Sequence, residues 1–154
     1  MEPMTIEVKD ETEMKAFGEK LGALFEGGEI LELIGDVGAG KTTLAKGIAQ
    51  GMGVDEDVQS PSFTISRVYD ASKGLHLAHY DFYRLHDAGI MAAELHETIH
   101  EPKTATIIEW AEIVSGVLPT DRLTLKIASP SETARSITCE PGGERSSTLL
   151  KRLV

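Results

Sequence analysis

A glycine-rich segment that ends in a lysine and a threonine carries the strongest chemical signal in this sequence. Residues 35–42 read GDVGAGKT and fit the pattern G-x-x-x-x-G-K-[ST] at every fixed position. The glycines allow a tight loop whose backbone N–H groups converge on phosphate oxygens, and the positive end of a following helix adds to the attraction. Lys41 can reach the β- and γ-phosphates of a nucleotide, and the Thr42 hydroxyl can ligate Mg²⁺. The alternative is a glycine-rich turn followed by an incidental Lys-Thr pair.

The flanking residues favour the phosphate-binding interpretation. An apolar run over residues 30–34 predicts a buried strand, and residues 41–52 predict a helix, which is the context that the motif requires. We therefore expect a nucleotide with Mg²⁺ at this loop. The loop residues expected to contact it are Asp36, Val37, Gly38, Ala39, Gly40, Lys41, Thr42 and Thr43.

A second carboxylate for Mg²⁺ is expected at the end of a hydrophobic strand. Residues 104–110 are β-branched and apolar and predict a central strand, at whose end Glu109 lies. That rim is where α/β sheets bind their ligands, so we predict that Glu109 holds the metal. Trp110 could belong to the core, the nucleotide site or a partner contact.

Polar residues also gather in HYDFYR, residues 79–84. Strand alternation places His79, Asp81 and Tyr83 on one face. Asp81 could orient or activate the attacking water or support Mg²⁺ indirectly; the alternative is a surface Asp-Arg pair. The hydroxyls of SPSFT, residues 60–64, could sense a γ-phosphate, as switch segments do, but a plain proline turn explains that segment equally well.

A competing motif points to another class of enzyme. Residues 96–100 read HETIH and fit H-E-x-x-H, the zinc-protease pattern, in which Glu97 would act as base. Pro102 ends the helix close to the second histidine, and no histidine follows, so a third ligand would have to be a carboxylate such as Glu109 or Glu112. A solvated helix face is therefore the better interpretation.

The glycine-loop motif and the pattern of strands and helices together predict a three-layer α/β P-loop NTPase domain covering residues 1–154, with a mixed, mainly parallel sheet and antiparallel hairpin and edge strands. The predicted helices cover residues 11–25, 41–52 and 90–99, and the predicted strands cover residues 4–8, 29–34, 63–69, 75–82, 104–110, 122–128 and 134–140. The strands at 63–69 and 75–82 would form a hairpin, and the strands at 122–128 and 134–140 would form an antiparallel pair. The final residues could form an edge strand or a helix.

Composition limits the partners and the compartment. The chain has 154 residues and a formal charge of −10, and its 15 basic residues are scattered, so we do not expect it to hold RNA or DNA by itself. No apolar run approaches the ~20 residues of a membrane span, and the N-terminus does not resemble a secretory signal. Cys139 is the only cysteine, which fits a reducing cytoplasm.

The nucleotide and the reaction class can be narrowed further. The sequence contains no asparagine, so the N-K-x-D motif that reads guanine in common GTPases is absent, which favours ATP. A small-molecule kinase and an ATPase serving a partner protein both remain possible. A kinase usually carries an arginine-bearing lid, whereas the six arginines here are dispersed.

Four segments in order resemble the TsaE (YjeE) family. They are GDVGAGKTT, SPSFTI, HYDFYRL and IIEWAE, and the resemblance extends from about residue 10 to residue 134. Val37 and Ser62 stand where the family often has Leu and Thr. The resemblance implies a weak, partner-dependent ATPase, required for threonylcarbamoyladenosine (t6A) synthesis beside the tRNA anticodon, which works with the TsaD–TsaB carbamoyltransferase pair and meets tRNA only through that complex.

The resemblance also implies roles for individual residues. Lys41 would hold phosphate, Thr42 and Glu109 would hold Mg²⁺, and Asp81 would assist hydrolysis, so that Lys41, Asp81 and Glu109 form the catalytic set. Glu11 and Arg135 would lie near the base. Two other readings stay open, namely a small-molecule kinase and a regulatory nucleotide-binding module without catalysis.

Overall fold

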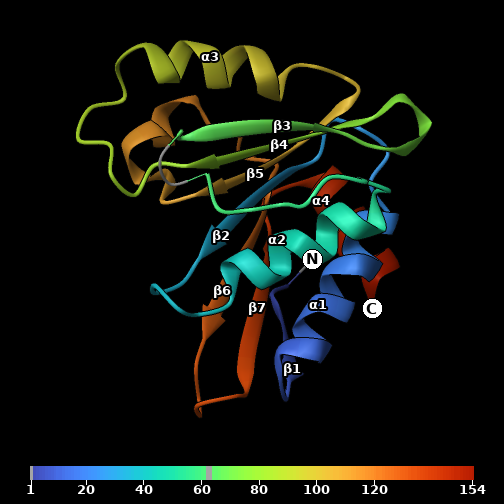
Figure 1. Ribbon diagram of the computed structural model, residues 1–154. Helices are drawn as coiled ribbons and strands as arrows, with labels where there is room; N and C mark the ends of the chain where they lie inside the picture. The colour runs from blue at the N-terminus through green and yellow to red at the C-terminus, as the bar shows by residue number, and fades with distance from the viewer. Residues whose placement is uncertain (1, 62–63) are drawn as a thin grey trace.

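The computed structural model describes residues 2–61 and 64–154 and contains one seven-stranded mixed sheet within them (Figure 1). The strands in chain order are β1 (Met4–Val8), β2 (Ile30–Ile34), β3 (Ser66–Asp70), β4 (His76–Asp81), β5 (Thr104–Glu109), β6 (Leu123–Ala128) and β7 (Arg135–Pro141). Their order across the sheet is β1-β7-β6-β2-β5-β4-β3. The four central strands, β6, β2, β5 and β4, run parallel, and the outer pairs β3–β4, β6–β7 and β1–β7 are antiparallel. The mixed sheet with a parallel centre is therefore confirmed.

Helices cover both faces of the sheet and give the three expected layers. Helices α1 (Glu11–Ala23), α2 (Lys41–Gly51) and α4 (Glu144–Leu153) belong to the larger apolar cluster. Helix α3 (Gly89–Ile99) and the 3₁₀ segment η2 (Ala111–Val117) belong to the smaller cluster on the other face, above the sheet in Figure 1. A second 3₁₀ turn, η1 (Ser72–Gly74), joins β3 to β4 as the expected hairpin connection.

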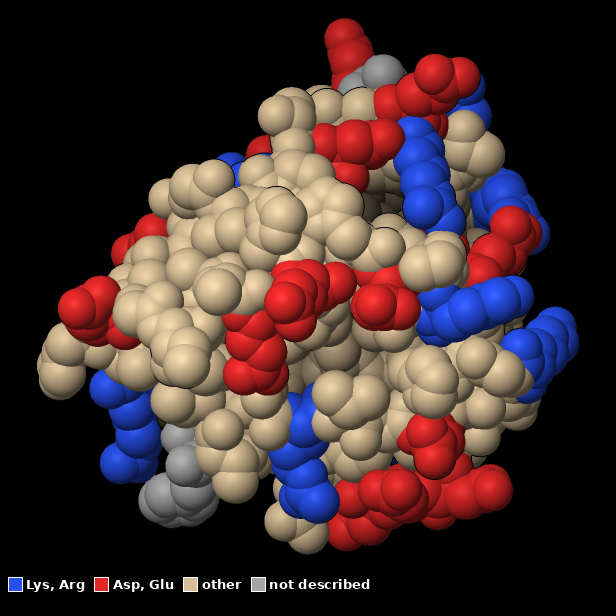
Figure 2. All heavy atoms as spheres, turned by 90° about the horizontal axis from the view of Figure 1, so that it is seen from above, with Lys and Arg blue, Asp and Glu red and all other residues tan. Residues whose placement is uncertain are grey.

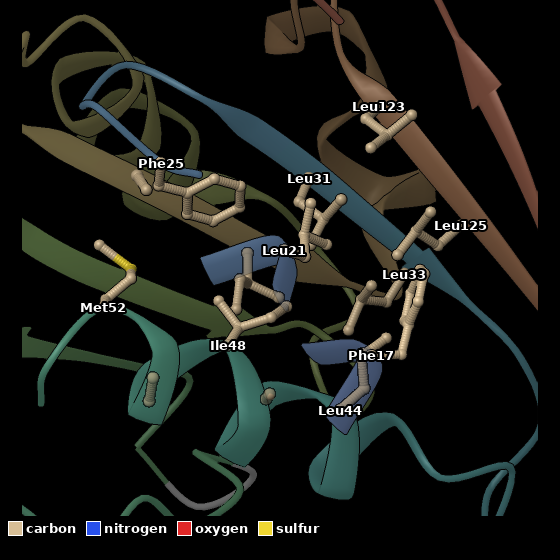
Figure 3. Packing of buried hydrophobic residues seen from close by; sticks show 14 of the residues in the cluster. Phe17, Leu21, Phe25, Leu31, Leu33, Leu44, Ile48, Met52, Leu123 and Leu125 are labelled. Atoms are coloured by element: carbon tan, nitrogen blue, oxygen red, sulfur yellow. The ribbon is translucent and has the colours of Figure 1, made fainter. Parts of the chain in front are cut away.

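The larger cluster fixes α2 against the sheet. Leu44 and Ile48 of α2 are fully buried and point toward the same space as Leu21 of α1 and Leu31 and Leu33 of β2 (Figure 3). Burying side chains of this size contributes roughly 1.5–3 kcal/mol each relative to leaving them exposed. The segment that joins β2 to α2 is thereby held at both of its ends.

Glycines let α1 and α2 approach each other unusually closely. Gly18 and Gly22 of α1 face Gly47 and Gly51 of α2, so each helix contributes a G-x-x-x-G repeat. A Cβ atom added at Gly18 would lie 2.6 Å from the carbonyl oxygen of Leu44, and one added at any of the other three would overlap a carbonyl oxygen of the opposite helix. These four positions therefore accept no larger residue without moving one helix away from the other.

Several element boundaries differ from the sequence-based expectation, most of them by one residue. The strand predicted over residues 63–69 begins at Ser66, because Ile65 has a positive φ of 70° and its N–H bonds to the Pro61 carbonyl; Phe63 lies outside the described residues. The first helix ends at Ala23 rather than at residue 25, and the strand predicted to include Trp110 ends at Glu109.

The C-terminal residues form a helix, which settles the choice left open by the sequence. Asp121, at the start of the β6 segment, caps α4 from outside. Its two carboxylate oxygens accept the backbone N–H groups of Arg145 and Ser146 at 2.9 and 3.0 Å, and Oδ1 also accepts the Ser146 hydroxyl at 2.6 Å. Burial by itself would raise the pKa of Asp121, but these hydrogen bonds outweigh it and lower that pKa below its ordinary value.

Two properties concern possible contact with a membrane or with a nucleic acid. Within residues 2–61 and 64–154, no helix has the combination of length and apolarity that crossing a membrane requires. On the face seen in Figure 2, Lys and Arg side chains lie among Asp and Glu side chains, and no continuous basic surface crosses that face.

Candidate nucleotide site

The candidate site lies where three neighbouring parallel strands end. β2 leads directly into the glycine loop, and β5 and β4 lie next to it in the sheet. Strand register pairs Leu33 with Glu109 and Glu109 with Asp81, so the two carboxylates occupy adjacent strand ends beside the loop. This is the edge at which open α/β sheets bind ligands.

The backbone of the loop has the conformation that its glycines allow. Gly38 and Gly40 have φ angles of +86° and +103°, which residues with a Cβ rarely adopt. Gly40 is the N-cap of α2, and neither a capping side chain nor an acidic residue occupies the first turn of that helix. The first N–H groups of α2 are therefore available to an anion, as they are at known phosphate-binding helix ends.

Lys41 is a buried cation held by three different groups. It is only 7% exposed, and its Nζ donates to the Gly35 carbonyl at 2.7 Å. The same Nζ lies 3.8 Å from Glu109 Oε1 and 4.1 Å from the centre of the Trp110 ring. A buried ammonium needs such partners, and a phosphate oxygen could replace the carbonyl among them.

Glu109 lies between the lysine and a buried histidine. It is 3% exposed, and its Oε2 lies 2.6 Å from Nε2 of His79, which is 1% exposed. The next residue, Trp110, leaves the strand with a positive φ of 56°, and its ring packs against Tyr83 with centroids 4.8 Å apart. Positive φ is uncommon for a bulky residue and is found preferentially at functional sites.

Asp81 is buried at the end of β4 and is 6% exposed, so it is not the surface residue of the alternative interpretation. Its Oδ1 accepts the backbone N–H of Tyr83 at 3.0 Å, which turns the chain away from the strand. Its Oδ2 lies 3.5 Å from the Ser60 hydroxyl, which connects β4 to the segment suggested as a γ-phosphate sensor. Ser62 of that segment lies outside the described residues.

These groups surround a cavity of about 730 Å³, within the size range of ligand pockets. The predicted site residues that line it are Glu11, Val37, Gly38, Gly40, Lys41, Thr42, Thr43, Asp81, Glu109 and Arg135. Asp36 and Ala39 belong to the loop but are not part of the cavity wall, and Ala39 is buried. A Cβ at Gly38 would meet no atom within 4 Å, so the loop borders open space.

Arg135 and Glu11 hold the loop and its helix from the side. The Arg135 Nε donates to the Ala39 carbonyl at 3.0 Å, and its Nη2 lies 3.4 Å from the Gly38 carbonyl. The Glu11 Oε1 accepts the Thr43 hydroxyl at 3.1 Å. Both side chains thus link the loop to other elements, and a contact with the base stays a prediction.

The residues present fit Mg²⁺ rather than a metal caged by protein ligands. No group of three or more His, Cys, Asp or Glu side chains among the described residues could hold an ion. Thr42 and Glu109 line the same cavity and offer oxygen ligands, which Mg²⁺ prefers. Mg²⁺ usually takes its other ligands from water and substrate phosphates, so this sparse set suits it.

The zinc-protease interpretation of HETIH gains no support. His96 and His100 lie on one side of α3 with ring centroids 4.5 Å apart, but both are exposed. His100 is already the C-cap of the helix, and its Nδ1 lies 2.7 Å from the His96 carbonyl oxygen. No third metal ligand joins them in the described part of the chain.

Sequence reasoning missed several cavity residues. Asp10, Met14, Glu132 and Thr133 also line the cavity. Met14 is 1% exposed and belongs to the larger apolar cluster, so it serves the core and the cavity wall together. Glu132 and Thr133 precede β7 in a loop that carries no motif, so only the folded chain brings them to the site.

Comparison with known proteins identifies the family. The model of the family described as "Threonylcarbamoyl adenosine biosynthesis protein TsaE" matches residues 8–137, most of the chain. The chain belongs to the TsaE family. TsaE proteins act in the biosynthesis of threonylcarbamoyladenosine on tRNA.

Individual TsaE relatives agree with this assignment. The Bacillus subtilis protein named tRNA threonylcarbamoyladenosine biosynthesis protein TsaE is 37% identical over 92% of this chain and 87% of its own length. The protein of that name from Streptomyces coelicolor is 34% identical over 88% of this chain and 95% of its own. A crystal structure of Bacillus subtilis YdiB superposes with a TM-score of 0.82 at 32% identity, covering 99% of this chain and 94% of that one.

Proposed function

We propose that this chain is the ATPase subunit of t6A synthesis, which binds ATP with Mg²⁺ and hydrolyses it in complex with the TsaD–TsaB carbamoyltransferase pair. The observation that carries the proposal is the junction of the glycine loop with Lys41 and Glu109 inside one cavity. The family role in t6A synthesis supplies the context, and the arrangement of these groups suggests the reaction.

Each residue has a role that follows from its chemistry. The backbone N–H groups of residues 38–42 and the N-terminal end of α2 bind the phosphates, because no side chain among the described residues caps that helix end. Lys41 moves from the Gly35 carbonyl to the β- and γ-phosphate oxygens. Thr42 and Glu109 hold Mg²⁺, which neutralises charge that develops on the phosphates during hydrolysis.

Asp81 is proposed to orient the attacking water. Its Oδ1 is bonded to the Tyr83 N–H, which fixes the carboxylate at the cavity wall beside Glu109. A fixed acceptor beside the γ-phosphate can hold water in line for attack, which is chiefly a matter of position.

Charge and composition support a division of labour with partners. The net charge of −10 opposes direct binding of a polyanion, so tRNA is expected to contact TsaD–TsaB while this chain supplies ATP turnover. The absence of asparagine removes the usual guanine-reading motif and favours ATP. We propose a cytoplasmic location because that is where tRNA is modified.

The proposal is tested with Lys41→Ala, using Lys46→Ala as the matched control. Lys46 is exposed on the same helix, one turn and a half further on, and does not line the cavity. We expect Lys41→Ala to abolish binding of a non-hydrolysable ATP analogue in calorimetry and to abolish phosphate release with TsaD–TsaB present. Lys46→Ala should leave both unchanged. Retention of both activities by a folded Lys41→Ala protein contradicts the assignment.

The reaction class is tested in the same assay. Radiolabelled ATP should release inorganic phosphate, and reconstituted tRNA modification should require this chain. Transfer of the label to a small metabolite would instead identify a kinase.

A further inference from the structure

His79 is a buried histidine that the reaction described above does not use. Its side chain is 1% exposed, and its Nε2 lies 2.6 Å from Oε2 of Glu109. His79 is not among the residues that line the nucleotide cavity, whereas Glu109 is. Its imidazole can therefore act on a nucleotide only through the carboxylate.

The parallel register of β4 and β5 brings the two residues together. The two strands lie side by side in Figure 1. His79 pairs with Ile107, and Asp81 pairs with Glu109. His79 and Asp81 share one face of β4 because side chains alternate along a strand, and this is the face toward α2. The imidazole consequently lies two residue pairs behind the strand ends, next to Glu109 and away from the cavity.

The hydrogen-bond network assigns the donor. Nδ1 of His79 is buried and has no hydrogen-bond partner among the described residues. An ionised carboxylate can only accept, so the hydrogen is placed on Nε2, an assignment made from the network. His79 then occupies Oε2 of Glu109, and Oε1 is left 3.8 Å from Lys41 Nζ.

We infer that His79 is a positioning residue that fixes the Glu109 carboxylate for Mg²⁺, a role that rests on the proposed function. A glutamate side chain at a strand end has several rotamers, and binding a metal requires one of them. The bond from His79 selects that rotamer in advance, as groups behind metal ligands commonly do. The imidazole itself touches neither nucleotide nor metal.

The test compares His79→Leu, which removes the donor, with His79→Gln, whose amide N–H can replace it. His76→Leu is the matched control, because His76 lies at the other end of β4 and pairs with Asp70 at 3.0 Å on the exposed surface. The readout is calorimetric binding of a non-hydrolysable ATP analogue over a range of Mg²⁺ concentrations, with thermal melting to establish that each variant is folded.

Mg²⁺ should increase the affinity for the ATP analogue, and we compare the Mg²⁺ concentration that gives half of this increase. In His79→Leu that concentration should rise about tenfold, the usual effect of removing a group behind a metal ligand. Binding without Mg²⁺ should stay within about twofold, and His79→Gln should recover most of the Mg²⁺ response. In a Glu109→Gln background, adding His79→Leu should have no further effect, because the group through which it acts is gone.

An unchanged Mg²⁺ response in folded His79→Leu overturns the inference. The inference is also overturned if folded His79→Gln loses as much of the Mg²⁺ response as is expected for His79→Leu, because His79 would then act by packing alone. If His79→Leu does not fold, the Mg²⁺ response of His79→Gln decides between the two roles. The proposed function fails separately, and earlier, if the unsubstituted protein shows no Mg²⁺-dependent ATP binding at all.

Discussion

Replacing Gly47 by alanine should separate α1 from α2 and destabilise the protein. A Cβ at this position would overlap the carbonyl oxygen of Lys15 and lie 3.1 Å from Cα of Gly18. Both obstacles are backbone atoms, so no side-chain rotation can relieve the clash and the helices themselves must move. The change tests whether the glycine contacts, rather than the surrounding leucines, set the position of α2.

The expected magnitude follows from two opposing effects. Overpacking a well-packed contact costs about 1–3 kcal/mol, and a backbone obstacle puts this case near the upper end. Alanine is favoured over glycine inside a helix by about 1 kcal/mol. The free energy of unfolding should therefore fall by about 2 kcal/mol, taking these two values together. For a chain of this size that lowers the melting temperature by about 4–8 °C.

Circular dichroism during urea and thermal unfolding measures the change. The control is Gly116→Ala, at an exposed position where a Cβ would meet nothing within 4 Å. That control should alter the free energy of unfolding by less than about 0.5 kcal/mol. If Gly47→Ala is as stable as Gly116→Ala, close packing against α1 does not hold α2 in place, and this reasoning is wrong.

Three further predictions concern other parts of the molecule. Arg135→Lys should weaken ATP binding about tenfold in calorimetry, because lysine cannot reproduce the guanidinium bonds to the Gly38 and Ala39 carbonyls; unchanged affinity would show that those bonds do not order the loop. Asp121→Ala should lower the free energy of unfolding by about 1 kcal/mol at neutral pH through loss of the α4 cap. Hydrogen bonding lowers the pKa of Asp121, so its carboxylate contributes to the free energy of unfolding above the ordinary pKa of 3.8, and this contribution should disappear as the pH falls below that value. Urea unfolding at several pH values can measure the loss. Burial raises the pKa of the Cys139 thiol from 9.0 to about 11, so the unfolded chain loses this proton before the native protein does. The stability advantage of the natural protein over Cys139→Ala should therefore shrink between about pH 9 and about pH 11, and a constant advantage would contradict this account.

Local patterns were sufficient to predict most of the elements and part of the site. The glycine loop, its flanking strand and its helix form one continuous segment, so residue spacing alone predicted them. Glu109 was recognised because it ends an apolar strand, and Asp81 because polar residues gather around it in the sequence. Strand register then placed the two side by side. The hairpin and the antiparallel C-terminal pair were confirmed for the same reason, since turns separate runs of strand-forming residues.

What the sequence did not predict depends on contacts between distant segments. His79 and Glu109 meet only because β4 and β5 adopt one particular register. Arg135 was expected near the base, yet its donors also bind carbonyls of a loop almost a hundred residues earlier, which no local pattern reveals. The Trp110 backbone turns at a positive φ that its residue type disfavours, so propensity pointed to a longer strand.

A crystal structure with a non-hydrolysable ATP analogue and Mg²⁺ tests the central claim most directly. The account predicts that the phosphates lie against the N–H groups of residues 38–42, with Mg²⁺ beside Thr42 and Glu109. Lys41 Nζ should leave the Gly35 carbonyl, to which it now donates at 2.7 Å, and bind phosphate oxygens. Nucleotide bound elsewhere, or phosphates in the loop while Lys41 still bonds to Gly35, would contradict it.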